Sequence, residues 1–185
     1  MGDDATLETL QKLVDGFSLD VGRVRAALAD DKTEEPARKL LVGALSYVID
    51  TWDMFPDHYR GVGLADDALV LRVACKLALD SGASHRGLQL LGGEMDVVRT
   101  LMGDLAEPLE KFCAALPQRT FADRTVDKIL GDPDVRAVFE GDLTRLAKKQ
   151  GSVQITVPPT GSAALLGELR KMMKSALTKA GFVTA

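Results

Sequence analysis

Stretches in which apolar residues recur every three or four positions alternate along the chain with short polar stretches rich in glycine, proline and aspartate. Such spacing places apolar side chains on one face of a helix. It predicts helices over residues 5–17, 19–30, 33–49, 66–82, 88–117, 121–130, 134–149 and 162–180. We expect the long segment to be bent or divided near Gly92 and Gly93 or near Pro108. The pattern is that of an all-α protein.

One of these segments, residues 33–49, is apolar over so wide an arc that other elements must surround it. Thr33 is a suitable N-cap for it, and Pro36 then falls in the first turn, where a missing amide donor is harmless. We therefore expect a single bundle of about seven or eight helices. Its centre is a helix pair, residues 40–49 and 69–79, antiparallel and joined by an acidic loop that contains proline and glycine.

Only residues 152–157 alternate apolar and polar positions in the manner of a strand, and prolines follow them. The sequence offers this strand no partner, so we expect it either to lie extended on the surface or to pair with another chain. We interpret residues 1–150 as a helical domain with an extension, 151–161 as an extended linker and 162–185 as a C-terminal amphipathic helix.

The acidic loop carries five carboxylates within eighteen positions: Asp50, Asp53, Asp57, Asp66 and Asp67. Grouped oxygen ligands can hold a divalent cation, and a bound cation can activate water for hydrolysis. The candidate ligands are Asp53, Asp57, Asp66 and Asp67. In the alternative interpretation, Asp53 and Asp66 cap helices and Asp67 complements a helix dipole. We favour capping, because the sequence has no glycine-rich phosphate loop, GxSxG or HExxH motif.

The stretch over residues 44–71, ALSYVIDTWDMFPDHYRGVGLADDALVL, resembles the signature of the YkvA-like family of domains of unknown function. The matching positions are Asp53, Pro56, Asp57, Gly63, Asp66 and Asp67. Asp50-Thr51 stands where the family has Ser-Pro, and Arg60 stands where it has a second proline. The resemblance extends over about residues 20–80 and implies a helical fold. It implies no activity, because the family has no established common one.

The net charge is -4 and the pI is about 5.2, which gives no long-range attraction to nucleic acid or to an anionic membrane. No apolar stretch reaches the ~20 residues that a membrane-spanning helix needs. The N-terminus is acidic where a signal peptide is basic, so we expect a cytoplasmic protein. Cys75 and Cys113 stand far apart and fit buried thiols in a reducing compartment.

The helix predicted over Ala163–Ala180 has a methionine-containing apolar face and several basic residues elsewhere. Such a helix can pack on its own domain, dock on a partner or on a second copy, or lie on a membrane. The acidic net charge disfavours the last. We favour internal packing and keep partner docking open. As to function, we expect a bacterial, non-enzymatic interaction or regulatory module without a cofactor, and the alternative is a divalent-metal-binding protein or hydrolase using the acidic loop.

Overall fold

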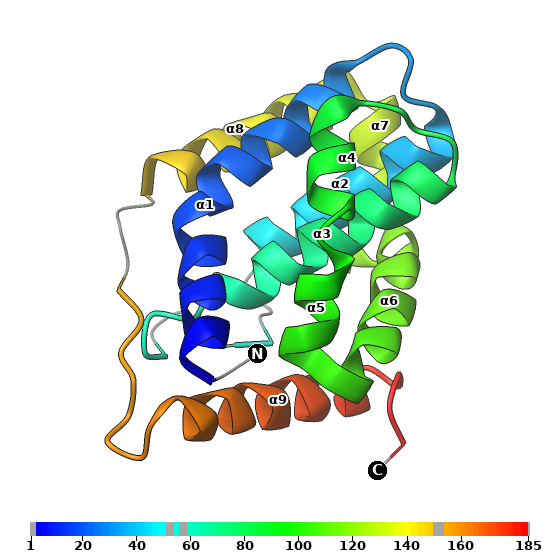
Figure 1. The fold of residues 1–185 in the computed structure, drawn as a ribbon. Coiled ribbons are helices and arrows are strands. Elements are labelled where there is room, and N and C mark those ends of the chain that lie inside the picture. The colour runs from blue at the N-terminus through cyan, green and yellow to red at the C-terminus, as the bar shows by residue number, and fades with distance from the viewer. Residues whose placement is uncertain (1–2, 51–53, 56–58, 150–153, 185) are drawn as a thin grey trace.

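In a computed structural model, residues 3–50, 54–55, 59–149 and 154–184 are described. These residues form α-helices and two 3-10 helices, η1 and η2, with one short hairpin, and confirm the all-α prediction (Figure 1). The elements are α1 (Asp3–Ala29), α2 (Glu35–Ile49), α3 (Ala65–Asp80), α4 (Arg86–Gly92), α5 (Met95–Met102), η1 (Gly103–Leu105), α6 (Ala106–Ala115), η2 (Leu116–Gln118), β1 (Thr120–Phe121), β2 (Arg124–Thr125), α7 (Val126–Gly131), α8 (Pro133–Lys149) and α9 (Ser162–Lys179).

The first helix is continuous, whereas the sequence pattern predicted two helices separated near Ser18. The buried positions Phe17, Val21 and Val24 keep helical spacing across that point, so the apolar face never changes direction. The separation at Ser18 was therefore wrong. A serine between two in-phase apolar stripes does not end a helix, because it neither removes an amide nor restricts the backbone.

The N-cap of the second helix lies one residue later than predicted. Glu34 occupies the N-cap position and its side chain makes no capping bond, while Pro36 lies in the first turn as expected. Thr33 is buried and its hydroxyl donates to the carbonyl of Ala27 at 2.6 Å. Thr33 thus closes the connection to α1 instead of capping α2, which corrects the N-cap prediction.

The predicted central pair is present. Every residue of α2 from Leu41 to Val48 is buried, and so is every residue of α3 from Ala65 to Cys75. Gly43 allows close packing here, because a Cβ at this position would lie 3.1 Å from the backbone of Leu116 in η2. The end of α2 lies beside the start of α3, with the acidic connection at that end of the bundle.

The long segment after α3 divides where the glycines predicted, between α4 and α5. It divides a second time at Gly103, whose φ of 57° is unfavourable for residues with a Cβ. Pro108 causes no break, because it lies in the first turn of α6. Gly92 also brings α4 against α3, since a Cβ there would lie 2.9 Å from the amide nitrogen of Lys76.

The helix predicted over residues 121–130 begins later than expected. Thr120 pairs with Thr125 and Phe121 with Arg124 in an antiparallel hairpin. Its two turn residues, Ala122 and Asp123, have positive φ of 43° and 64°, a backbone conformation that a helix excludes. Only from Val126 is the chain helical, so the first part of this prediction was wrong.

The chain before α9 runs extended along the surface. Described residues 154–157 form no strand, which favours the extended alternative of the strand prediction; residues 152 and 153 lie outside the described chain. The amide of Thr156 donates to the carbonyl of Arg60 at 2.9 Å, and that of Ile155 donates to the Gln11 side chain at 2.9 Å.

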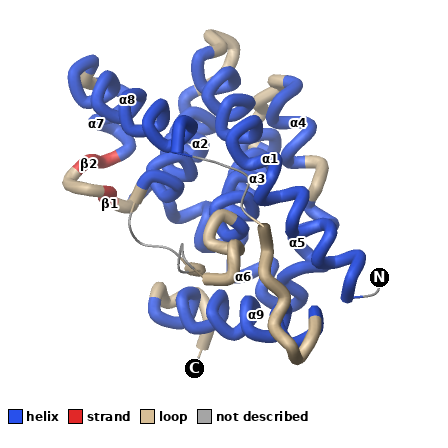
Figure 2. Tube along the Cα trace, turned by 90° about the vertical axis from the view of Figure 1, so that its left-hand side faces the viewer, coloured by secondary structure: helices blue, strands red, loops and turns tan. Residues whose placement is uncertain are grey.

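The C-terminal helix α9 lies across one end of the bundle, against α1, α6 and η1 (Figures 1 and 2). Its inward face is buried and consists of Leu165, Leu166, Leu169, Met173, Ala176 and Leu177. Arg170 donates to the carbonyls of Leu101 and Thr100 at 2.8 and 2.9 Å. The favoured interpretation, internal packing of this face, is the one observed. No helix within the described residues is long and apolar enough to cross a membrane.

Candidate functional site

The structure places the predicted acidic residues in different situations. Asp53 and Asp57 lie outside the described residues, so their predicted roles stay predictions. Asp66 and Asp67 are buried in the first turn of α3, and Asp50 follows the last residue of α2. What the fold brings together around Asp66 is therefore a phenol and two backbone amides, from α2 and from the connection.

The Asp66 carboxylate joins three segments. Its Oδ2 accepts from the Tyr47 hydroxyl at 2.6 Å, from the Met54 amide at 2.7 Å and from the Phe55 amide at 3.2 Å. The N-cap position of α3 belongs to Leu64, which makes no side-chain capping bond. The capping prediction for Asp66 was therefore wrong: this carboxylate holds the connection against both central helices. Asp67 lies in the first turn, as the dipole interpretation requires.

Burial dominates the electrostatics of this junction. It raises the pKa of Asp66 to about 6, while the bonds from Tyr47, Met54 and Phe55 act in the opposite direction because they favour the ionised carboxylate. Burial, together with the nearby carboxylates, raises the pKa of Tyr47 well above its ordinary value. Within the described chain, no three His, Cys, Asp or Glu residues are grouped to hold a metal ion.

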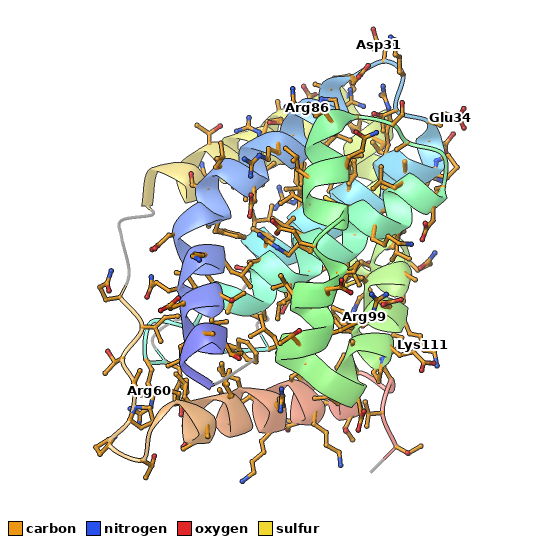
Figure 3. All side chains as sticks on the ribbon, viewed as in Figure 1. Asp31, Glu34, Arg60, Arg86, Arg99 and Lys111 are labelled. Atoms are coloured by element: carbon orange, nitrogen blue, oxygen red, sulfur yellow. The ribbon has the colours of Figure 1, made fainter. Side chains whose placement is uncertain are left out.

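A second site, which sequence reasoning did not identify, lies between the C-terminal half of α1, the start of α2, and helices α7 and α8. It encloses a cavity of about 170 Å³. The cavity is lined by apolar side chains and, at its edge, by charged ones: Leu28, Ala29, Val42, Ile129, Leu130, Phe139, Arg25, Arg38, Arg136 and Glu140. We call this feature the arginine cleft. Figure 3 shows Asp31, which borders its outer mouth, at the tip of the loop between α1 and α2.

Backbone carbonyls hold two of the arginines in place. Arg38 donates from Nε to Thr33 at 2.6 Å and from Nη2 to Asp30 at 3.1 Å. Arg136 donates from Nε to Ile129 at 3.3 Å and from Nη2 to Leu130. Carbonyls at and beyond the end of a helix lack intrahelical partners, so these guanidinium groups satisfy them. Carbonyls therefore fix both side chains, and Arg38 Nη2 also lies 4.0 Å from the exposed carboxylate of Asp31.

The third arginine, Arg25 of α1, pairs with Glu140 of α8. Among the described residues, this is the one ion pair between these two helices. Arg25 Nη2 lies 2.6 Å from Glu140 Oε2, and both side chains are about one-third exposed. At the outer mouth, Lys39 lies 3.0 Å from Glu35 and 3.0 Å from Asp127, so opposite charges balance there. The inner cavity, in contrast, has three arginines against one glutamate in a protein of net charge -4.

Part of this site had a signal in the sequence. Arg136, Phe139, Glu140 and Leu143 follow helical spacing, so α8 was bound to present an arginine and a glutamate beside an apolar stripe. Which helix would face that stripe had no local signal, because Arg25 is 115 positions from Glu140. The cleft exists only through packing of segments distant in sequence.

The lining of the arginine cleft offers hydrogen-bond donors and apolar surface, and contains no serine, cysteine or histidine among the described residues. Both cysteines lie in the core, where burial raises the pKa of Cys75 to about 12 and raises the pKa of Cys113 as well. Their thiols stay protonated at neutral pH. Comparisons with protein families, curated proteins and solved structures find no match for this chain.

Proposed function

We propose that this protein is a non-enzymatic binding module whose interaction site is the arginine cleft. The observation that supports this most directly is a mostly apolar cavity, partly open to solvent, with three arginines in its lining. Concave apolar sites with a few fixed polar groups are the usual form of binding sites. We also propose that residues 20–80 form a YkvA-like module, on the strength of the motif positions alone.

The chemistry of the cleft favours binding over catalysis. Catalysis of group transfer needs a nucleophile with a base that activates it, or a pair of acid and base groups. The only carboxylate of the described cavity lining is Glu140, and Arg25 holds it. Arginine guanidinium groups remain charged at every physiological pH and act by recognition of anions.

An experiment on the cleft tests this proposal directly. We would select peptides from a random phage-displayed library on the wild type, then measure the selected peptides against two tryptophan variants. Ala29→Trp places a large ring in the cleft from an exposed position, and Ala163→Trp adds the same ring at an exposed position of α9. We expect a family of peptides that binds the wild type and Ala163→Trp but not Ala29→Trp. A selection in which every binder tolerates Ala29→Trp would contradict the proposal.

A divalent-cation site in the acidic connection is the second candidate, and one observation favours it. Asp66 Oδ1 is buried and has no hydrogen bond in the described part of the chain. A cation that binds the native state raises the unfolding temperature by mass action. Thermal-shift titrations with magnesium, manganese, calcium and zinc, on the wild type and on Asp53→Ala/Asp57→Ala, test it. A cation-specific rise that the double variant lacks would support the site, and no rise with any of the four would exclude it.

A further inference from the structure

We infer that the arginine cleft binds an acidic segment of a partner protein, in which one large apolar side chain is flanked by carboxylates. This inference rests on the proposed function and adds the chemistry of the partner to it. Four properties of the cleft lead to it: the size of the cavity, its charge, the way its arginines are held, and the exchangeable contact between Arg25 and Glu140.

The size of the cavity limits the apolar part of the partner. An apolar cavity of ~150 Å³ is known to accept a benzene molecule. The cleft's cavity of about 170 Å³ is therefore suited to one phenylalanine or leucine side chain and is too small for two. The floor that such a side chain would contact includes Leu28, Val42 and Phe139, which come from α1, α2 and α8.

The charge of the cavity specifies what lies beside that side chain. Arg25, Arg38 and Arg136 together outnumber Glu140, so the edge of the cavity is positive although the protein is acidic overall. Carboxylates are the biological anions that match a guanidinium in flat, paired hydrogen bonds, alongside phosphates. At the outer mouth Asp31, Glu35 and Asp127 are balanced by Arg38, Lys39 and Arg136, so the mouth adds no further attraction for a long polyanion such as nucleic acid.

The arginines are held in advance for this contact. In the described structure the bonds of Arg38 and Arg136 use Nε and Nη2, which leaves Nη1 of each without a hydrogen bond. Because backbone carbonyls fix these side chains already, a ligand need not immobilise them, and binding loses less conformational entropy. Each free Nη1 is a donor of the kind that a carboxylate accepts.

Glu140 occupies the place of a partner carboxylate on Arg25. Their contact at 2.6 Å is about one-third exposed on each side, and exposed ion pairs contribute little to stability. A carboxylate of the partner can therefore replace Glu140 on Arg25 at small cost. It follows that Glu140 competes with the partner, and that its neutralisation strengthens binding.

The test uses the full-length protein and fluorescein-labelled peptides measured by fluorescence anisotropy at low salt. One set has an acidic residue on each side of a central Phe, Leu, Ile or Trp; a second set replaces Asp and Glu by Asn and Gln; a third replaces the central residue by Ser. We expect the neutral set to bind about tenfold more weakly, because charge-assisted bonds are lost, and the Ser set to lose measurable binding.

Variants of the protein then test the individual contacts. Glu140→Gln should tighten binding of the acidic peptides by about threefold, and Arg25→Gln should weaken it by about fivefold. Both positions are partly exposed, so both variants keep the folded core, which circular dichroism can verify. Ala29→Trp should abolish binding and Ala163→Trp should leave it unchanged.

The outcomes separate this inference from the proposed function. If neutral peptides bind the wild type as tightly as acidic ones do, and Ala29→Trp abolishes this binding, the inference is overturned and the cleft remains a binding site. Acidic peptides with no binding tighter than about 1 mM would overturn it too, while the phage selection decides the proposed function separately. Binding of the acidic peptides that Ala29→Trp does not affect would overturn the inference, because these peptides would then bind outside the cleft. A weaker affinity of Glu140→Gln would contradict the exchange between Glu140 and the partner.

Discussion

Two ion pairs on α1 use the same chemistry in opposite surroundings. Asp20 lies 3.1 Å from Arg72 of α3, with side chains only 2% and 6% exposed, while Arg25 lies 2.6 Å from Glu140 of α8, with side chains 32% and 39% exposed. Arg72 Nη2 and Asp20 Oδ2 are close enough for an ion pair but are not aligned as a hydrogen bond. Asp20 and Arg25, the α1 members of the two pairs, are five positions apart on the same helix.

The two pairs differ in how many further partners their residues have and in how far their side chains are exposed to water. Asp20 also binds Arg23 at 2.7 Å, and Arg72 also binds Glu94 at 2.7 Å and the carbonyl of Ala68 at 3.0 Å. A buried pair costs much desolvation and is tolerated only when such extra bonds satisfy it, whereas an exposed pair is worth little. The buried pair therefore fixes α1 on α3, and the exposed pair is free to change partners.

The largest expected effect is on the buried pair. Arg72→Met should lower the free energy of unfolding by about 3 kcal/mol, because it leaves the buried Asp20 carboxylate with only the partly exposed Arg23 as a cationic partner. Urea unfolding measured by circular dichroism gives this value. As a control, Asp20→Leu/Arg72→Met removes both charges and should recover much of the loss. A single variant that costs less than about 1 kcal/mol would show that the pair does not hold α1 on α3.

The next test concerns Asp66, a buried carboxylate with no cation partner among the described residues, whose contribution to stability depends on pH. The pKa of Asp66 is about 6 in the folded protein against 3.8 for the ordinary group. Between these values the folded protein binds more protons than the unfolded chain. The contribution of Asp66 to stability is therefore complete below pH 3.8 and is lost as the pH rises through 6, by up to about 3 kcal/mol.

Asp66→Asn isolates this contribution from that of the other acidic residues. The free energy of unfolding of the wild type minus that of Asp66→Asn should fall between pH 4 and pH 7. Urea titrations of both proteins at several pH values measure the difference. A difference that is constant with pH would mean that the bonds from Tyr47, Met54 and Phe55 offset burial, and a difference that rises with pH would mean that they outweigh it.

The smallest expected effect on the free energy of unfolding is that of the exposed pair, Arg25 and Glu140. Glu140→Gln and Arg25→Met should each change the free energy of unfolding by about 0.5 kcal/mol or less. The same urea titrations apply, and high salt should change these values little further. A loss above about 2 kcal/mol in either variant would make this pair structural, and Glu140 would then be no exchangeable competitor in the cleft.

Most helices could be predicted because apolar residues recur within each of them at helical spacing, as in α2 and α9. It failed where the deciding contact is distant or the signal is subtle. The turn at Ala122 and Asp123 contains no glycine, so its positive φ had no marker. Asp66 was recognised as special but assigned a local role, because its acceptor bonds reach back to Tyr47 and Met54.

The functional site was less predictable than the fold. The arginine cleft combines Arg25, Arg38 and Arg136, and no local spacing relates them. Their convergence around one cavity follows from the packing of α1, α2, α7 and α8, which periodicity does not encode.

The position of α9 has a consequence for how the protein is made. This helix covers the N-terminal end of α1, and Arg170 satisfies carbonyls at the end of α5, so it seals elements that leave the ribosome long before it. Until α9 emerges, the apolar surface that it covers is exposed on a nascent chain. Such surfaces favour aggregation and the binding of chaperones. During the interval between synthesis of α5 and synthesis of α9, this apolar surface is therefore open to such contacts.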